Sequence, residues 1–200
     1  STIPFYVHRV VDLSESEFSC FKSFKTVNPE ARNHPVFSTD LAREAAALRA
    51  LRHPAILQFF DYGVVEGKPY LIYRYIWGKS LLQILRELRR HKKRLAQPYA
   101  LFIAHELTRI LSCAHAVRKK DFPHGITHAN LSPRNIILSY SGKVNLVGIG
   151  HPGPMVAPEH LELLDFRYMS YLSPEQVARE TVTFKTDIFT LGCILYEMLT

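Results

Sequence analysis

The polar residues with the clearest chemical potential lie in one short segment, 128–135, directly ahead of an apolar run that predicts a strand. The segment reads His-Ala-Asn-Leu-Ser-Pro-Arg-Asn. The amide of Asn130 can hydrogen-bond a hydroxyl group, but it has no basic site that accepts a proton at neutral pH. The single neutral oxygen of Asn135 is a poor ligand for Mg²⁺, which prefers anionic oxygen ligands. The segment therefore offers hydrogen-bonding groups but no carboxylate.

Other polar groups favour structural roles over chemistry. His124 and His128 have the i, i+4 spacing of some metal ligands, but they fall in a predicted loop, so we expect no metal site there. The three cysteines, Cys20, Cys113 and Cys193, lie far apart without C-x-x-C spacing. They predict buried free thiols in a reducing compartment rather than disulfides or a zinc site.

The hydrophobic pattern predicts strands first and helices later. Residues 5–25 are β-branched and aromatic with a polar interruption at 14–17, which predicts two strands joined by a turn. The apolar positions Leu41, Ala45, Leu48 and Leu51 predict one face of a helix that starts at Asp40. A hairpin follows, with predicted strands over 56–62 and 70–76 and a turn at Glu66-Gly67. After a break at Gly78 the pattern is helical up to Val117, with one buried stripe formed by Ile103, Leu107, Ile110, Leu111 and Ala114. A second hairpin (135–138 and 144–149) and a helix after Thr186 complete the predicted elements.

The charge of the chain is concentrated in one stretch. The 200 residues carry 25 Lys and Arg against 18 Asp and Glu, a net charge of +7, and most of the excess lies in 86–94. This run follows Leu81, Leu85 and Leu88 at the end of a predicted helix, so we expect a solvated face, with an anionic partner as the alternative. An apolar share of 47% with 22% charged residues predicts a globular chain and excludes a disordered or fibrous one.

Segment 128–135 and the segment Gly148-Ile149-Gly150 together resemble the protein kinase family, in which the catalytic loop reads H-R-D-L-x-x-x-N and a later motif D-F-G. The resemblance is to the bacterial members that are similar to eukaryotic Ser/Thr kinases. Further matches follow in the family's order, namely Lys25 with the lysine of V-A-I-K, Glu44 with the helix glutamate, Ser173-Pro174-Glu175 with A-P-E, and Asp187 with the aspartate that opens Asp-x-(Trp/Phe)-(Ser/Thr)-Leu-Gly. Lys22 is the alternative to Lys25, although the spacing to Glu44 favours Lys25.

The resemblance implies an α+β, bilobal kinase-like fold, with a small β-rich lobe over 1–76 and a helical lobe over 77–200. Both ends are expected to be truncated, because the glycine-rich loop and the terminal helices of the large lobe are missing, and we expect the chain to be a piece of a longer one. A bulky gatekeeper, Tyr73, is expected to narrow the adenine pocket. The implied nucleotide-binding residues are Lys25, Glu44, Tyr75 and Asn135. For Lys25 and Glu44, an ion pair that only locks the helix to the sheet is the favoured interpretation.

The resemblance is broken at the positions that carry chemistry. Asn130 stands at the position of the catalytic aspartate, which accepts the proton of the substrate hydroxyl in the family. Gly148 stands at the position of the aspartate that holds Mg²⁺, so no metal-binding residue is expected. Ala129 replaces the arginine that pairs with an activation-loop phosphate, which makes the usual phosphorylation switch improbable.

The positions with architectural roles in the family are retained. Leu48, His128 and Ile149 are expected to stack as an apolar spine between the lobes. Asp187 is expected to accept backbone hydrogen bonds from segment 128–135, and Glu175 is implied as a structural residue. Loss of the catalytic groups with retention of their supports is the pattern of a pseudokinase.

The sequence therefore predicts a catalytically inactive pseudokinase domain that acts as a signalling or scaffold module through protein partners. ATP remains a candidate ligand, whereas Mg²⁺ is not expected. The alternative is a divergent active Ser/Thr kinase that transfers the ATP γ-phosphate, and a nucleic-acid binder acting through 86–94 is a third class that we do not expect. No apolar run approaches the ~20 residues of a membrane span and no secretion signal is present, so the cytoplasm is the expected location.

Overall fold

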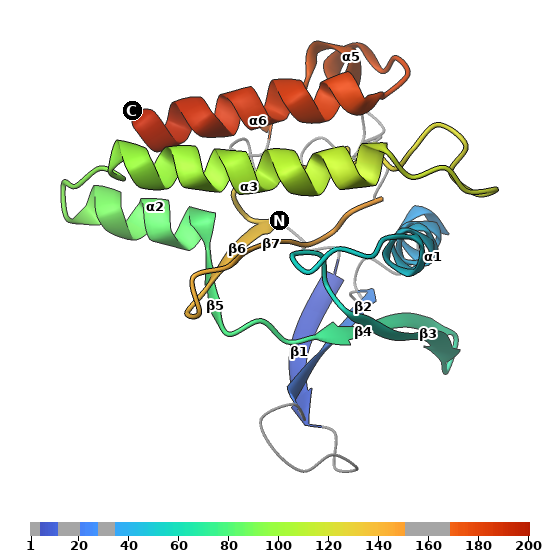
Figure 1. The fold of residues 1–200 in the computed structure, drawn as a ribbon. Helices are drawn as coiled ribbons and strands as arrows, with labels where there is room; N and C mark the ends of the chain where they lie inside the picture. The colour runs from blue at the N-terminus through green and yellow to red at the C-terminus, as the bar shows by residue number, and fades with distance from the viewer. Residues whose placement is uncertain (1–4, 12–20, 28–34, 151–168) are drawn as a thin grey trace.

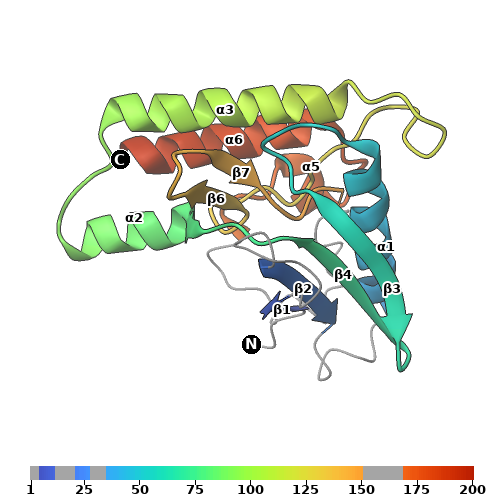
Figure 2. The ribbon, with the colours of Figure 1, turned by 60° about the horizontal axis from the view of Figure 1, so that its bottom comes forward.

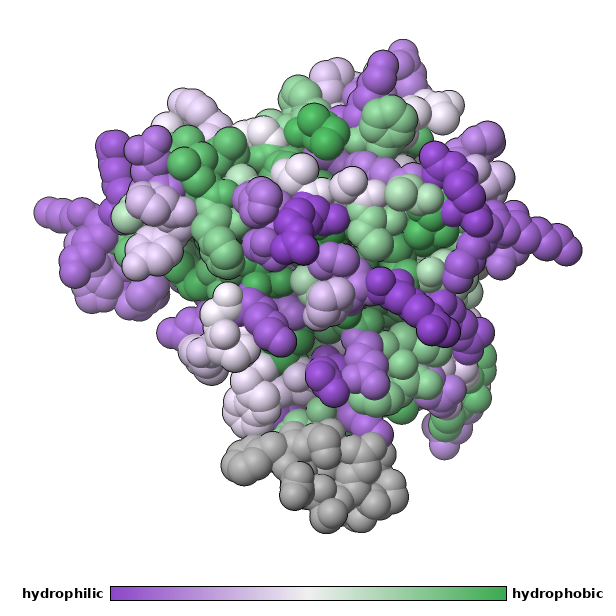
Figure 3. All heavy atoms as spheres, viewed as in Figure 1, coloured by the Kyte–Doolittle hydropathy of each residue, from purple (hydrophilic) through white to green (hydrophobic). Residues whose placement is uncertain are grey.

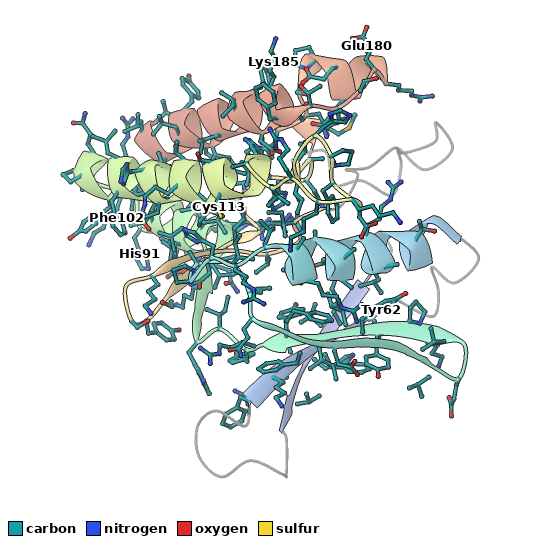
Figure 4. The ribbon with its side chains drawn as sticks, turned by 45° about the vertical axis from the view of Figure 1, so that its right-hand side comes forward. Tyr62, His91, Phe102, Cys113, Glu180 and Lys185 are labelled. Atoms are coloured by element: carbon teal, nitrogen blue, oxygen red, sulfur yellow. The ribbon has the colours of Figure 1, made fainter. Side chains whose placement is uncertain are left out.

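The computed structural model describes residues 5–11, 21–27, 35–150 and 169–200, which form a sheet with one helix and a larger helical part (Figure 1). In the described residues the first sheet is antiparallel, in the order β1-β2-β4-β3. Helix α1 contacts β3 and β4, and Tyr62 of β3 lies between the sheet and that helix (Figure 4). The elements of this lobe are β1 (Phe5–Val11), β2 (Phe21–Val27), α1 (Pro35–Ala50), β3 (Phe59–Val65) and β4 (Lys68–Arg74).

The second lobe is mainly helical, and α3 lies beside α6 in both ribbon views (Figures 1 and 2). A small sheet in the order β5-β6-β7 packs against α2 and α3. The predicted stripe on α3 is buried, from Ile103 at 2% exposure to Ala114 at 0%, and faces this interior. The elements are β5 (Gly78–Ser80), α2 (Leu81–Arg90), α3 (Gln97–His115), β6 (Ile136–Ser139), β7 (Val144–Leu146), α5 (Pro174–Ala178) and α6 (Phe184–Leu199).

The two lobes are connected by the linker after β4, and they also meet where β7 lies against residues 55–56. The backbone N–H of Leu146 on β7 donates to the carbonyl of Ala55 at 3.2 Å, next to a single parallel bridge between Ile56 and Leu146. At the linker, the N–H of Tyr140 donates to the carbonyl of Trp77 at 2.9 Å. One backbone hydrogen bond thus joins the two lobes directly, and the other fixes the linker to the second lobe.

The two-lobed fold predicted from the sequence is confirmed, with differences at individual elements. Helix α1 begins at Pro35 rather than Asp40. Gly78 is not a break before a helix but the first residue of strand β5, which pairs with β6. A Cβ at this position would lie 2.2 Å from the carbonyl oxygen of Leu138 on β6. Close strand pairing, which only glycine permits, explains this residue.

The cysteines and the surface also differ in part from expectation. Cys113, labelled on α3 in Figure 4, and Cys193 are free but only half-buried, so full burial was wrong, and Cys20 lies outside the described residues, as does the expected turn at 14–17. The basic side chains of 86–94 are exposed, as predicted. The face shown in Figure 3 carries apolar and polar side chains in an irregular mixture. Within the described ranges, no helix combines the length and apolar character needed to span a bilayer.

Two glycines should respond in opposite directions to alanine. Gly67, in the β3–β4 turn, has φ +70°, so Gly67→Ala is expected to lower the free energy of unfolding by about 1–2 kcal/mol. Gly192 lies within α6 with no atom within 4 Å of a Cβ built there, so Gly192→Ala is expected to raise that free energy by about 0.5–1 kcal/mol. Urea denaturation measures both, and equal signs would contradict the assigned backbone conformations.

Candidate functional site

A buried ion pair connects the first sheet to helix α1. The ammonium Nζ of Lys25 on β2 lies 2.5 Å from Oε2 of Glu44, and the two residues are 9% and 1% exposed. Glu44 shares the buried face of α1 with Leu41 and Leu48. Lys22, the alternative lysine, instead places Nζ 4.5 Å from the centroid of the Phe60 ring. The structure thus brings Lys25 to Glu44.

Tyr73 fills space next to this ion pair. It faces Ser23 across the β2–β4 pairing and is only 8% exposed. Burial, and then the nearby charge of Glu44, raise the pKa of its phenol, while a hydrogen bond with Ser23 partly offsets the rise. The phenol is neutral at physiological pH, so this position adds bulk and a hydrogen bond but no charge.

The side chain of Asn135 is bonded to the backbone of Asn130 rather than presented as a free ligand. The amide Nδ2 of Asn135 donates to the backbone carbonyl of Asn130 at 2.6 Å, and the carbonyl of Asn135 accepts from the N–H of Val147 at 2.9 Å. These contacts set the start of β6 against the end of β7. The amide of Asn135 therefore already has a role within the loop.

Gly148 lies beside this pair in a left-handed conformation, with φ +76°. A Cβ built there would have Nδ2 of Asn135 at 3.6 Å as its nearest neighbour, which is an ordinary van der Waals contact. A side chain would therefore fit, at the conformational cost of a non-glycine residue with positive φ. The sequence supplies no carboxylate at this position, although the neighbouring atoms would admit a Cβ.

The residues present do not fit a magnesium site. Mg²⁺ requires oxygen ligands in near-octahedral geometry and is usually held by carboxylates together with phosphates. Asn130 and Gly148 offer no carboxylate. In the portion of the chain that the structure describes, no three His, Cys, Asp or Glu residues are grouped so as to hold a metal. His124 is exposed, while His128 is fully buried in a separate network.

One buried carboxylate fixes the backbone of segment 128–135. Asp187, at 0% exposure on α6, accepts the N–H of His128 through Oδ2 and the N–H of Ala129 through Oδ1, each at 2.8 Å. Nε2 of His115 on α3 lies 2.8 Å from the same Oδ2. Ala129 has φ +59°, a strained conformation that these hydrogen bonds hold in place.

The side chain of His128 is held as a neutral ring. Its Nδ1 accepts the N–H of Asn130 at 3.2 Å, and its Nε2 lies 3.0 Å from the carbonyl of Val147, so Nε2 carries the hydrogen. Burial lowers the pKa of His128, although the charge of Asp187 opposes the shift. The neutral form suits a residue that links the loop to the end of β7.

Glu175 belongs to a second contact between α5, α6 and the loop. The hydroxyl of Thr186 donates to Glu175, and this hydrogen bond is the main reason that the pKa of the carboxyl is lowered. Nε2 of the adjacent Gln176 donates to the carbonyl of Ala129 at 2.7 Å. Sequence reasoning missed His115, Gln176 and Thr186. The Ser173-x-x-Gln176 capping box was a signal for Gln176, because it marks the start of α5.

The apolar candidates lie where the lobes approach each other. Leu48 (3% exposed) and Ile149 (0%) belong to one continuous buried cluster. The next residue, Gly150, has φ +80°, and a Cβ there would lie 2.5 Å from Cβ of Ala47 on α1, so the backbone packs directly on the helix. Tyr75, in the linker, is half-buried and contacts the ring of Trp77 edge-on, with centroids 5.1 Å apart.

The Lys25–Glu44 pair joins β2 to α1, and Asp187 of α6 anchors the loop that carries Asn130. Both features agree with the family to which the sequence is similar. Residues 6–200 match the family model described as "Protein kinase domain". The chain belongs to the protein kinase family. The kinase domain of PknI from Mycobacterium tuberculosis has the same fold, with a TM-score of 0.71 and 22% identity over 96% of this chain and 66% of that one.

Curated relatives in the kinase family are similar over most of the chain. Serine/threonine-protein kinase PknE of Mycobacterium tuberculosis is 30% identical over 179 residues, which cover 89% of this chain and 30% of that protein. Tyrosine-protein kinase MasK of Myxococcus xanthus is 31% identical over 179 residues, covering 88% and 28%. The chain thus spans less than a third of the length of these relatives.

The Lys25–Glu44 pair should be costly to break but not to replace. Lys25→Met leaves Glu44 buried without its partner and is expected to lower the free energy of unfolding by about 3–5 kcal/mol. Adding Glu44→Leu should recover most of that loss, because no unpaired buried charge remains. Urea denaturation measures both variants, with Lys22→Met as the control. A loss below about 1 kcal/mol in Lys25→Met would show that Glu44 is not desolvated as described.

The neutral His128 should make stability depend on pH. Its pKa is lower in the folded state than its ordinary value of 6.5, so the unfolded chain binds the extra proton first as pH falls. The stabilisation is full above about pH 6.5 and decreases below it, by up to about 1.4 kcal/mol per pH unit. His128→Gln should have a shallower dependence between pH 6.5 and 5, and parallel pH profiles in denaturation experiments would contradict the assignment.

Proposed function

We propose that this kinase-family domain does not transfer phosphate and acts as a signalling or scaffold module through contacts with other proteins. The observation that carries the proposal is the pair Asn130 and Gly148, which stand where the family's catalytic and metal-binding carboxylates stand. General-base catalysis is typically worth about 10²- to 10⁴-fold, and a metal ion adds several kcal/mol of transition-state stabilisation. Loss of both leaves little phosphotransfer activity.

The retained contacts support a role that depends on shape. Asp187, His128 and Gln176 still position the loop that carries Asn130, although the loop has no base to present.

We also propose a nucleotide site without a metal ion in the groove between a lobe of residues 1–76 and a lobe of residues 77–200. Lys25 is the candidate contact for phosphate oxygens, Tyr75 for the base and Asn135 for a polar group of the ligand, while Glu44 orients Lys25. ATP is the candidate ligand. The free thiols of Cys113 and Cys193 fit a reducing compartment, so we propose a cytoplasmic location.

The rival function is phosphotransfer by a divergent enzyme, and it is favoured by the curated relatives, which are named as protein kinases. Those names also differ in the acceptor, serine or threonine in one and tyrosine in the other. An active enzyme would need a metal arrangement other than the one lost at Gly148.

The direct test is transfer of labelled γ-phosphate from ATP by the full-length protein, with Mg²⁺ or Mn²⁺, to itself and to a generic protein substrate. We expect no signal above that of Lys25→Ala, with Lys22→Ala as the matched lysine control. Turnover at roughly 1–100 s⁻¹ that Lys25→Ala abolishes and Lys22→Ala retains would establish the enzyme instead. Thermal unfolding gives a second readout, because the proposal expects any stabilisation by ATP to be independent of Mg²⁺.

A further inference from the structure

A cluster of three aromatic rings surrounds one arginine where the small lobe meets the linker between the lobes. The guanidinium carbon of Arg9 on β1 lies 5.4 Å from the ring centroid of Phe21, 5.7 Å from that of Tyr75 and 5.4 Å from that of Trp77. The rings also contact each other edge-on, Phe21 with Trp77 at 5.4 Å between centroids. Cation–π contacts of this length are attractive, so Arg9 is held in this cluster.

Strand register shows which face of the sheet Arg9 occupies. Arg9 lies opposite Ser23, and Val7 lies opposite Lys25. Directly opposed residues of an antiparallel pair share a face, and Phe21 is on that face as well because it lies two residues from Ser23. Arg9 is therefore on the side of the sheet that carries the Lys25–Glu44 pair. Lys22 is on the other side, over the ring of Phe60.

Two of the three rings belong to the linker between the lobes. Tyr75 and Trp77 lie after the end of β4 at Arg74 and before β5, which starts at Gly78. The Arg9 side chain thus reaches from β1 to the linker along the inner face of the sheet. A flat base could not lie against the Tyr75 ring from this face while the guanidinium remains there, because both would occupy the same space over the ring.

We propose that the Arg9 side chain occupies the part of the nucleotide site next to Tyr75 and Trp77. In that position it excludes the base of a nucleotide until the side chain moves away. This inference rests on the nucleotide site described under the proposed function and concerns which state of that site is open. Arg9 itself is exposed, so its release exchanges ring contacts for water and is only moderately unfavourable. Val7, not Arg9, lies opposite Lys25, so the candidate phosphate contact is two residues further along the strand.

The experiment is isothermal titration of the full-length protein with ADP and with ATP, in EDTA to remove divalent ions. Arg9→Ala is expected to bind about tenfold more tightly than the unmodified protein, because the base no longer competes with the guanidinium. Inorganic pyrophosphate, which lacks a base, should bind both proteins equally. Lys22→Ala is the matched control, since it removes a cation–π contact from the outer face of the same sheet and should change nothing.

Unchanged or weaker ADP binding by Arg9→Ala would overturn the proposal, and so would equal gains for ADP and pyrophosphate. If the alanine variant unfolds below assay temperature, Arg9→Gln is measured in its place, because it keeps a polar side chain on the strand. The phosphotransfer assay is separate. Activity in the unmodified protein would refute the proposed function, whereas the change in ADP affinity alone decides the role of Arg9.

Discussion

The buried carboxylate of Asp187 is the interaction on which the rest of the site depends. A fully desolvated charge is costly unless several donors satisfy it, and here the donors are the backbone N–H groups of His128 and Ala129 with the ring of His115. This one contact joins α3, α6 and segment 128–135. It holds Ala129 at a positive φ and so aims the following Asn130, whatever side chain that position carries.

Support and chemistry are therefore separable in this molecule. The hydrogen bonds that shape the loop run mainly to backbone atoms, so a different side chain at position 130 or 148 leaves them intact. Gly148 illustrates the same point, because the neighbouring atoms leave room for a Cβ that the sequence does not supply, at the cost of a positive φ. A domain can lose a proton acceptor and a cation ligand in this way while its folded shape survives.

Much of the fold was predictable because the apolar periodicity of α1 and α3 directly reflects what they bury. The pairing of Lys25 with Glu44 was implied by the resemblance to protein kinases, and the spacing to Glu44 favoured Lys25 over Lys22. Strand β5 was not predictable, since Gly78 is explained only by its close approach to Leu138 across the chain. Gln176 and Thr186 were missed for a similar reason, because their roles arise from tertiary hydrogen bonds, and the ring of aromatic residues around Arg9 depends on three separate segments meeting.

The backbone connection of Leu146 to Ala55, together with the linker at Trp77, gives the molecule two points of attachment between its lobes. Gly150, which packs directly on α1, adds a further contact between the two lobes. A change in the relative position of the lobes must therefore break a backbone hydrogen bond or separate Gly150 from Ala47.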